Sequence, residues 1–454
     1  MRQETAVMDV TVQDMMEARE RRAQRQRELL AEYGQTLLCF TLNIPGPEKD
    51  GALIRQGFRL GQRRLRQGFL RLGIQPLHQE ESLEFTGCEA FYVLPLAPLE
   101  IKRMTADIEQ ADEAGRLFDL DVLRPDGSKV DRREIGLPER ACLICGREAK
   151  ACARSRAHTV AELRARVDGI LSRAVAQDKI ETVARLACQA LLCEVLTTPK
   201  PGLVDRLNNG SHRDMDVFTF AASTTALQPY FAACARIGAQ AATAPDAFAA
   251  LRLPGRMAEG VMLEATGGVN THRGAIFSIG ILCAAAGRLP RENWRAELLL
   301  AECAEMTKGL TERDFAGLTP ENARTFGQKL YLSHGVSGVR GEAEQGFPLV
   351  REYGYPKLLE GLAAGLELND AGCAALLALM AHNVDTNVIH RGGLEGQRRT
   401  AEAAQALLDA EPWPSREALE ALDQTLIDQN ISPGGSADLL ALCYLLRFLE
   451  EDDP

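Results

Sequence analysis

Hydrophobic and polar residues follow two different periodicities along this chain, and the change lies near residue 159. Before it, the charged amphipathic segment 14–31 predicts a helix. Three short apolar runs, at 36–44, 90–96 and 118–123, predict strands that end at turn-forming residues. The last run leads into R-P-D-G-S, a turn of the hairpin type. We therefore expect an α+β domain in the first part of the chain.

Helical periodicity predominates from Thr159 onwards. The segment T-V-A-E at 159–162 is a capping box, which starts a helix. Clusters of Pro and Gly interrupt the later pattern, and few segments after residue 200 alternate as strands do. The second part is therefore predicted to be an all-α helical bundle. We place the two domains at 1–175 and 176–454, with the boundary inside or between two helices.

The composition is that of a globular protein and excludes several functional classes. With 454 residues, the chain is too long for one compact core. Its net charge is −11. General binding to nucleic acid or to a membrane surface needs a basic face, so this charge argues against both. The first residues have no apolar signal-peptide core, and the longest uncharged run, 217–235, contains Thr, Ser, Gln and Pro. Most of the twelve cysteines stand singly in apolar helical patterns, as buried thiols do in a reducing compartment. We expect a cytoplasmic protein with no nucleic-acid or membrane partner.

Two aspartates in the third predicted strand form a candidate metal site. Asp119 and Asp121 are two residues apart, so a strand directs both carboxylates to one face. Such a pair can share Mg²⁺, which grips a phosphate chain and neutralises charge during displacement at phosphorus. A strand end with two solvated acids is the alternative.

The segment 51–75 is rich in arginine. Four of its arginines follow helical i, i+4 spacing on one face. This face is either a solvated basic surface or a docking surface for an acidic partner or a polyphosphate. The arginines of the segment are Arg55, Arg59, Arg63, Arg64, Arg66 and Arg71.

Three cysteines and a histidine lie close together before the capping box. Cys142, Cys145, Cys152 and His158 could close a tetrahedral zinc site of three thiolates and one imidazole. The spacing is shorter than in common zinc modules, so a packed thiol cluster is the alternative.

Four strings in this part of the chain carry a family resemblance. T-L-N-I-P-G-P, G-R-L-F-D-L-D-V, I-G-L-P-E-R-A-C-L-I-C-G and C-A-R-S-R-A-H resemble the citrate lyase holo-acyl-carrier-protein synthases over residues 8–170. The resemblance implies transfer of the prosthetic group to a serine of the acyl carrier subunit of citrate lyase, with release of pyrophosphate. It also implies a nucleotidyltransferase-like use of Asp119 and Asp121 as catalytic metal ligands. The Gly-Ser pair that nucleotidyltransferases usually carry upstream of such a pair is missing here.

Five polar clusters punctuate the helical part, at 198–216, 264–274, 333–343, 382–393 and 432–438. Each combines Gly with Asn, His, Arg or a carboxylate. Gly lets a backbone approach a ligand closely, and helix N-termini favour anions. The clusters are either ordinary turns between helices or loops that converge on one polar, metal-using site at one end of a bundle.

These clusters supply the candidate residues of that site. Lys200, Arg206, His212, Arg273 and Arg340 offer cations for a triphosphate, and Asn270, His272 and Glu342 are further candidates for binding substrate. The candidate catalytic carboxylates are Asp214, Glu264 and Asp385, and the candidate metal ligands are Asp214 and Asp216. His272 and His334 are otherwise interior histidines with satisfied hydrogen bonds, and Asp205 is a further candidate acid.

The same clusters carry a second resemblance. E-V-L-T-T-P-K-P-G-L-V-D-R-L-N-N-G-S-H-R-D-M-D, G-V-N-T-H-R-G-A-I-F-S-I-G, H-G-V-S-G-V-R-G-E-A and D-T-N-V-I-H-R-G-G resemble triphosphoribosyl-dephospho-CoA synthase over 180–450. That family joins the ribose C1 of ATP to the 2′-hydroxyl of 3′-dephospho-CoA and releases adenine, which implies Mg²⁺ with ATP as substrate.

The two resemblances together imply a fusion of consecutive enzymes, because the product of the second half is the substrate of the first. Two alternatives remain open from the sequence. One is the related maturation system of malonate decarboxylase. The other is a non-catalytic zinc interaction module fused to a nucleotide-binding helical domain.

Overall fold

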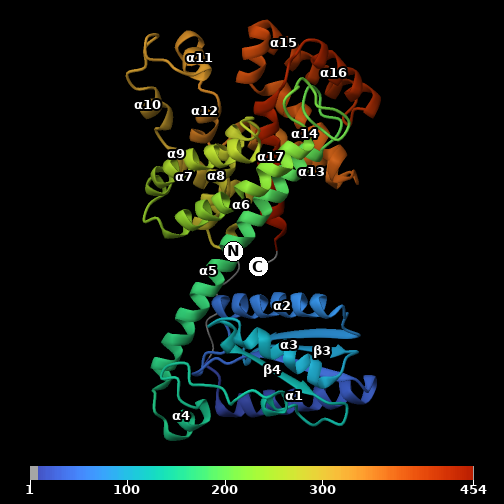
Figure 1. Cartoon of the computed structure of the whole chain (residues 1–454), viewed down its shortest axis with the longest axis vertical. Coiled ribbons are helices and arrows are strands. Elements are labelled where there is room, and N and C mark those ends of the chain that lie inside the picture. Colours follow the sequence, from blue (N-terminus) through green and yellow to red (C-terminus); the bar gives the residue numbers. More distant parts are fainter. Residues whose placement is uncertain (1–8, 453–454) are drawn as a thin grey trace. The chain divides into compact units, whose positions relative to one another are not determined.

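A computed structural model describes residues 9–452 of the chain. Its contacts divide the chain into two compact units, Met1–Asp178 and Lys179–Pro454 (Figure 1). The predicted division of an α+β part from a helical part is confirmed, and the division falls inside one long helix, α5 (Val160–Leu196).

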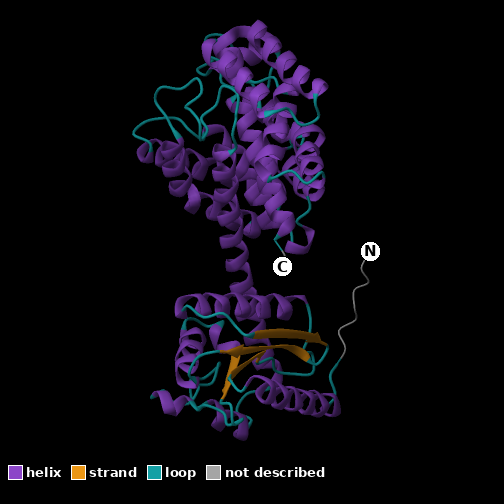
Figure 2. Ribbon diagram, turned by 90° about the vertical axis from the view of Figure 1, so that its right-hand side faces the viewer, coloured by secondary structure: helices purple, strands orange, loops and turns teal. Residues whose placement is uncertain are grey.

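The N-terminal unit is built on a four-stranded antiparallel sheet (Figure 2). Its strands are β1 (Thr36–Leu42), β2 (His78–Glu84), β3 (Gly87–Leu94) and β4 (Phe118–Leu123), in the order β2-β3-β1-β4. The predicted strands correspond to β1, β3 and β4. The sequence analysis missed β2, since H-Q-E-E-S-L-E is an edge strand with few apolar residues to alternate.

Helices cover both faces of this sheet. On one face, α1 (Val12–Tyr33) packs Leu29 and Leu30 against Leu37 and Cys39 of β1. On the other, α2 (Ala52–Leu72) and α3 (Pro98–Gln110) pack against the alternate residues of β1. Burial on both faces explains why β1 reads as a continuous apolar run and not as an alternating one.

Short elements connect β4 to the long helix. They are η2 (Arg132–Ile135) and α4 (Ala149–Ser155), while η1 (Gly115–Leu117) directly precedes β4. The hairpin-type turn after β4 is confirmed, since Gly127 N donates to the carbonyl of Arg124 at 2.8 Å. The capping box before α5 is confirmed as well, because Glu162 N donates to Thr159 Oγ1 at 3.2 Å and the Glu162 carboxylate accepts from Thr159 N at 2.8 Å.

The C-terminal unit contains no strand among residues 179–452. After α5 its helices are α6 (Val217–Gln240), α7 (Ala244–Ala265), α8 (Arg273–Arg288), η3 (Arg291–Asn293), α9 (Ala296–Thr307), α10 (Leu310–Phe315), α11 (Phe326–His334), α12 (Val339–Glu344), η4 (Val350–Gly354), α13 (Tyr355–Ala363), α14 (Leu368–His382), α15 (Thr386–Ala410), α16 (Arg416–Asp428) and α17 (Gly434–Glu451). No helix that the structure describes is both long and apolar enough to cross a membrane.

Three nearly buried helices, α8, α14 and α17, form the centre of this unit. Helices α6 and α8 approach closely through glycine. A Cβ added to Gly238 would lie 2.0 Å from the carbonyl oxygen of Ala284, and one on Gly287 would lie 2.1 Å from that of Ala235. This packing holds the C-terminal part of α8 close against α6.

Candidate functional site

The predicted aspartate pair lies on the edge strand of the N-terminal sheet. Asp119 is opposite Thr41 and Asp121 is opposite Cys39 of β1, so both carboxylates lie on the face that α1 covers. The Lys129 ammonium is 2.5 Å from the Asp121 carboxylate. Burial and the charge of Asp121 together raise the pKa of Asp119. The geometry is that expected from the spacing, while the metal role stays a prediction.

Basic side chains surround the aspartate pair. Arg140 Nη2 lies 3.9 Å from the Asp119 carboxylate and pairs with the buried Glu109, as does Arg132. The buried Lys102 donates to a β4 carbonyl at 3.0 Å, and burial lowers its pKa. Two carboxylates among several cations suit a phosphate chain that arrives with a divalent ion.

The cysteine cluster of Cys142, Cys145, Cys152 and His158 is brought together as the sequence predicts. Its four ligand atoms lie within 4.8 Å of one another, and among the described residues no other group of three or more such ligands converges in this way. The Arg147 side chain, more than the neighbouring His158, lowers the pKa of Cys145 to about 5. The hydrogen bond from Cys145, together with burial, raises the pKa of Cys152 to about 11. Three thiols and one imidazole at these separations fit a structural zinc.

The arginine-rich segment forms α2, and most of its basic face is already paired. Four of the six arginines contact an acidic residue of the N-terminal unit. The pairs are Arg55–Asp50, Arg59–Glu81, Arg63–Asp178 and Arg64–Asp112. Arg66 and Arg71 are exposed. This arrangement favours a neutralised helix face, and docking of an acidic partner stays a prediction.

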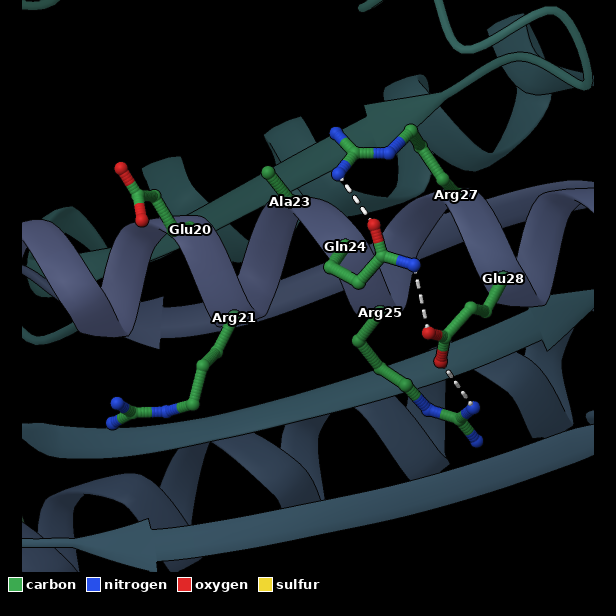
Figure 3. Close-up of a pocket in the computed structure, with 7 residues that line it drawn as sticks. All are labelled: Glu20, Arg21, Ala23, Gln24, Arg25, Arg27 and Glu28. Atoms are coloured by element: carbon green, nitrogen blue, oxygen red, sulfur yellow. Dashed lines mark hydrogen bonds and ion pairs between the residues drawn. The ribbon is translucent and has the colours of Figure 1, made fainter.

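One surface hollow contains none of these groups. It has a volume of about 590 Å³ and lies over α1, lined by Glu20, Arg21, Ala23, Gln24, Arg25, Arg27 and Glu28 (Figure 3). The lining comes from one helix, and its polar side chains hydrogen-bond to one another, as Gln24 does to Glu28 at 2.9 Å. A hollow of this kind lacks the convergent apolar walls of a ligand pocket.

The C-terminal unit contains a buried polar centre, formed by Glu194, Lys200, His272, Asp385 and Asp438. Lys200 is 2% exposed and ion-pairs with Glu194 at the end of α5, which is 4% exposed. Burial raises the pKa of Glu194. His272 is 2% exposed, and burial, assisted by the charge of Lys200, lowers its pKa to about 3. The imidazole is therefore neutral at physiological pH.

Three helix N-termini point their backbone N–H groups into the polar centre. Asp385 caps α15 by accepting from Asn387 N at 2.9 Å, and it also accepts from Ser436 N of α17 at 2.9 Å. Asp438 accepts from Ala275 N near the start of α8, and burial with the charges of Glu194 and Asp385 raises its pKa well above the ordinary value. Helix N-termini favour anions, so they hold both carboxylates in place.

A hydrogen-bonded chain orients the imidazole of His272. Thr271 Oγ1 donates to Ser223 Oγ at 2.8 Å, and Ser223 Oγ lies 2.7 Å from His272 Nδ1. His272 Nε2 is enclosed and has no hydrogen-bond partner among the described residues. A buried, unpartnered ring nitrogen is costly unless a ligand atom or water meets it, which makes the polar centre a candidate ligand site.

Sequence reasoning named neither Glu194 nor Asp438 as a candidate, although Asp438 is the carboxylate of the 432–438 cluster. Each is a single acid in a helix of mostly apolar residues, L-L-C-E-V-L and S-A-D-L-L-A-L. An isolated carboxylate on an apolar helix face was the signal that could have found them.

The loop at 198–216 contributes one group to the polar centre and fixes others locally. Asp205 is buried and accepts from Lys200 N at 2.9 Å and Leu207 N at 2.7 Å, which makes it a turn residue and not a free acid. Asp216 caps α6 by accepting from Thr219 N at 2.8 Å. The carboxylate that we predicted to bind a metal is therefore already hydrogen-bonded to the start of the helix. Asp214 is 65% exposed beside His212, at 3.9 Å.

The remaining candidates have partners of their own. Arg206 donates to Asn369 at 3.0 Å, Arg273 lies 3.1 Å from Glu259, and Arg340 donates to Asp314 at 2.8 Å. Glu264 is exposed in the last turn of α7. Asn270 is exposed just before α8 and accepts from Arg273 N at 3.3 Å. Glu342 accepts from Leu349 N at 3.2 Å, and burial raises its pKa to about 7. His334 is exposed at the end of α11, beside Ser333.

Comparison with known proteins agrees with the division of the chain. Residues 10–174 match the family model of apo-citrate lyase phosphoribosyl-dephospho-CoA transferase, and residues 180–454 match that of ATP:dephospho-CoA triphosphoribosyl transferase. Protein CitXG of Haemophilus influenzae is 38% identical over 97% of this chain and 96% of its own length. A probable 2-(5''-triphosphoribosyl)-3'-dephosphocoenzyme-A synthase of Albidiferax ferrireducens is 46% identical over 61% of this chain and 93% of its own. The synthase of Pectobacterium atrosepticum is 44% identical over 62% of this chain and 96% of its own.

Proposed function

The chain belongs to the apo-citrate lyase phosphoribosyl-dephospho-CoA transferases through its N-terminal part and to the ATP:dephospho-CoA triphosphoribosyl transferases through its C-terminal part, and we propose that each unit carries its own active site. The chain is a bifunctional transferase of citrate lyase maturation. The alternatives of malonate decarboxylase maturation and of a non-catalytic zinc module are not favoured by these relatives.

The C-terminal unit makes 2′-(5″-triphosphoribosyl)-3′-dephospho-CoA at the polar centre. The 2′-hydroxyl oxygen of dephospho-CoA forms a bond to the ribose C1 of ATP, and the bond from that carbon to adenine breaks. The hydroxyl proton passes to a carboxylate, and Asp438 suits this role because it is partly buried and its raised pKa makes it a stronger base. Asp385 accepts backbone hydrogen bonds from the starts of two helices, so it is better suited to holding those helix ends in position.

Lys200 and His272 have different roles in this reaction, because Lys200 is a cation and His272 is a neutral imidazole. Lys200 supplies positive charge beside Glu194, where a triphosphate can replace the carboxylate as its partner. His272 Nε2 lies enclosed without a partner among the described residues, so it is available to a substrate oxygen. The exposed side chains Arg206 and Arg273 extend the positive charge toward solvent.

A magnesium ion with the triphosphate would be held by Asp214 and by phosphate oxygens. Asp214 fits because it is 65% exposed, whereas the Asp216 carboxylate is bonded to the start of α6. Mg²⁺ in nucleotide sites takes one or two carboxylates together with phosphates and waters. The ion would neutralise charge on the triphosphate.

The N-terminal unit transfers the product to a serine of the carrier protein at the aspartate pair. The serine oxygen forms a bond to the phosphorus nearest the ribose, and the bond from that phosphorus to the terminal diphosphate breaks. Lys102, Lys129 and Arg140 stabilise the negative charge that grows on the departing diphosphate. Asp119 and Asp121 would hold Mg²⁺ there, as their common face allows. An Asp-x-Asp pair on an antiparallel sheet supports a nucleotidyltransferase-like site.

The single observation that carries the first activity is the buried polar centre with its unpartnered imidazole nitrogen. The test incubates the full chain with ATP, 3′-dephospho-CoA and Mg²⁺ and measures free adenine, with dephospho-CoA omitted as the control. Adding the apo carrier protein should then release pyrophosphate and raise the carrier mass by one phosphoribosyl-dephospho-CoA. Adenine release that does not depend on dephospho-CoA would contradict the proposal. We place both reactions in the cytoplasm, in keeping with twelve free cysteines.

A further inference from the structure

The segment between β4 and α5 has almost no apolar core of its own. From residue 131 to residue 159, the buried residues are Cys142 and Cys152, both members of the cysteine cluster. Its helices are short, with four residues in η2 and seven in α4. A segment that buries so little apolar surface needs another source of stability, and small domains commonly obtain it from a metal or a cross-link.

The cysteine cluster has the chemistry and the spacing of a zinc site. Cys145 Sγ and Cys152 Sγ are 3.4 Å apart, and all four ligand atoms lie within 4.8 Å. Thiolates bound to one tetrahedral zinc lie about 2.3 Å from the ion and so about 3.8 Å from one another. His158 Nε2 is enclosed and has no hydrogen-bond partner in the described part of the chain, which is the state of a nitrogen that a metal would satisfy. Arg147 donates to Cys145 Sγ at 3.4 Å and offsets the negative charge of a three-thiolate site.

The backbone of the cluster also holds Arg140. Cys142 N donates to the carbonyl of Arg147 at 2.6 Å, and Gly146 N donates to that of Cys142 at 3.2 Å, which closes the turn around the first two ligands. Ala149 N, at the start of α4, donates to the carbonyl of Arg140 at 2.9 Å. Arg140 is thus fixed at its main chain by the same turn and helix that carry the ligands.

The side chain of Arg140 reaches the transfer site. Its guanidinium donates to the carbonyl of Phe118 at 3.0 Å, pairs with Glu109, and lies 3.9 Å from the Asp119 carboxylate. A planar guanidinium recognises phosphate oxygens in pairs, and its binding depends on a fixed orientation. The distance from the ligands to this group along the chain is short, since Cys142 follows Arg140 by two residues.

We propose that zinc in the cysteine cluster acts as a clasp that positions Arg140 for the phosphates of the donor at the aspartate pair. This inference rests on the proposed transfer activity of the N-terminal unit. It predicts what loss of the zinc does. Donor binding in the transfer step should weaken, and the adenine-releasing step should be unchanged.

The test uses the full chain and supplies purified triphosphoribosyl-dephospho-CoA and apo carrier protein. We expect elemental analysis to find one zinc per chain, and Cys152→Ser to lose it. Transfer by Cys152→Ser should fall about ten- to a hundred-fold, mainly through a higher KM for the donor, with adenine release unchanged. Cys88→Ser, a buried thiol outside the cluster in the same unit, is the matched control and should keep both zinc and transfer.

Two further measurements separate positioning from general unfolding. Arg140→Gln should keep its zinc and show the same rise in KM for the donor. Wild-type protein stripped by a chelator should regain transfer when zinc is added back, while hydrogen exchange in the sheet stays slow throughout.

The outcomes are distinguishable from failure of the proposed function. Wild-type protein that holds zinc but does not transfer would contradict the function of the N-terminal unit. A chain without zinc in which Cys145 and Cys152 form a disulfide would overturn the clasp. A zinc-free Cys152→Ser protein that transfers within about two-fold of wild type, well short of the ten-fold or larger loss expected, would overturn it equally.

Discussion

Replacing Lys200 by methionine separates the structural and chemical roles of the polar centre. Methionine keeps much of the side-chain volume and removes the ammonium group. Glu194, which is 4% exposed, then loses the partner of its buried ion pair. Breaking a buried pair on one side typically costs about 3–5 kcal/mol, because an uncompensated charge remains.

The size of this effect can be followed by thermal unfolding. For a unit of this size, 1 kcal/mol shifts Tm by about 2–4 °C, so Lys200→Met should lower the Tm of the C-terminal unit by about 6–20 °C. The double variant Lys200→Met with Glu194→Gln has no buried charge at this position and should recover most of the loss. We expect neither protein to release adenine from ATP and dephospho-CoA, because both lack the cation that the triphosphate needs.

The stability of Lys200→Met should also depend on pH. Burial already raises the pKa of Glu194 in the folded chain, and removing Lys200 raises it further. Between the unfolded value of 4.5 and the higher folded value, the folded state binds more protons than the unfolded state. The stability that protonated Glu194 contributes to the folded variant is therefore fully present below the unfolded pKa. This contribution is lost as pH rises through the folded pKa. The double variant lacks the titrating group and should show a weaker dependence.

The measurements are differential scanning calorimetry between pH 5 and 8 and chromatographic detection of adenine. Carrier modification with supplied intermediate is the control, since it depends on the other unit and should be unchanged. Recovery of adenine release in the double variant would refute the phosphate role of Lys200. A Tm within about 2 °C of wild type for the single variant would refute the buried-pair argument, because it corresponds to about 1 kcal/mol or less.

Two further outcomes follow from the geometry of the sites. Asp119→Asn and Asp121→Asn should each slow carrier modification at least about a hundred-fold and leave adenine release at the wild-type rate; modification within about two-fold of wild type in both would show that the pair is a solvated strand end. Gly274→Ala places a Cβ 2.0 Å from Asp438 Oδ2, so the carboxylate must move, and adenine release should fall about a hundred-fold. Gly260→Ala, where a Cβ meets no atom within 4 Å, is the matched control and should retain activity, and equal rates in the two alanine variants would argue against Asp438.

Features that depend on neighbours along the chain could be predicted from the sequence. The i, i+2 spacing of Asp119 and Asp121 sets their common face, because side chains alternate along any strand. The capping box at Thr159 and the closeness of the cysteine cluster follow from short separations in the same way. The cap at Asp216 could also have been read from the sequence, because Thr219 follows three residues on, although the sequence analysis names Asp216 as a candidate metal ligand.

Pairings between distant segments were decided by the tertiary structure. The arginines of α2 were consistent with either a solvated face or a docking surface, and Glu81, Asp112 and Asp178 lie opposite them only once the chain is folded. Glu194 lies six residues from Lys200, whereas Asp438 reaches the start of α8 and the neighbourhood of Glu194 only through the packing of α5, α8 and α17. Local sterics and hydrogen bonds depend on a few adjacent residues, so the order of those residues in the sequence is enough to predict them. The groups that meet Asp438, at the starts of α8 and α15, come from segments far along the chain, so their identity depends on how the helices pack.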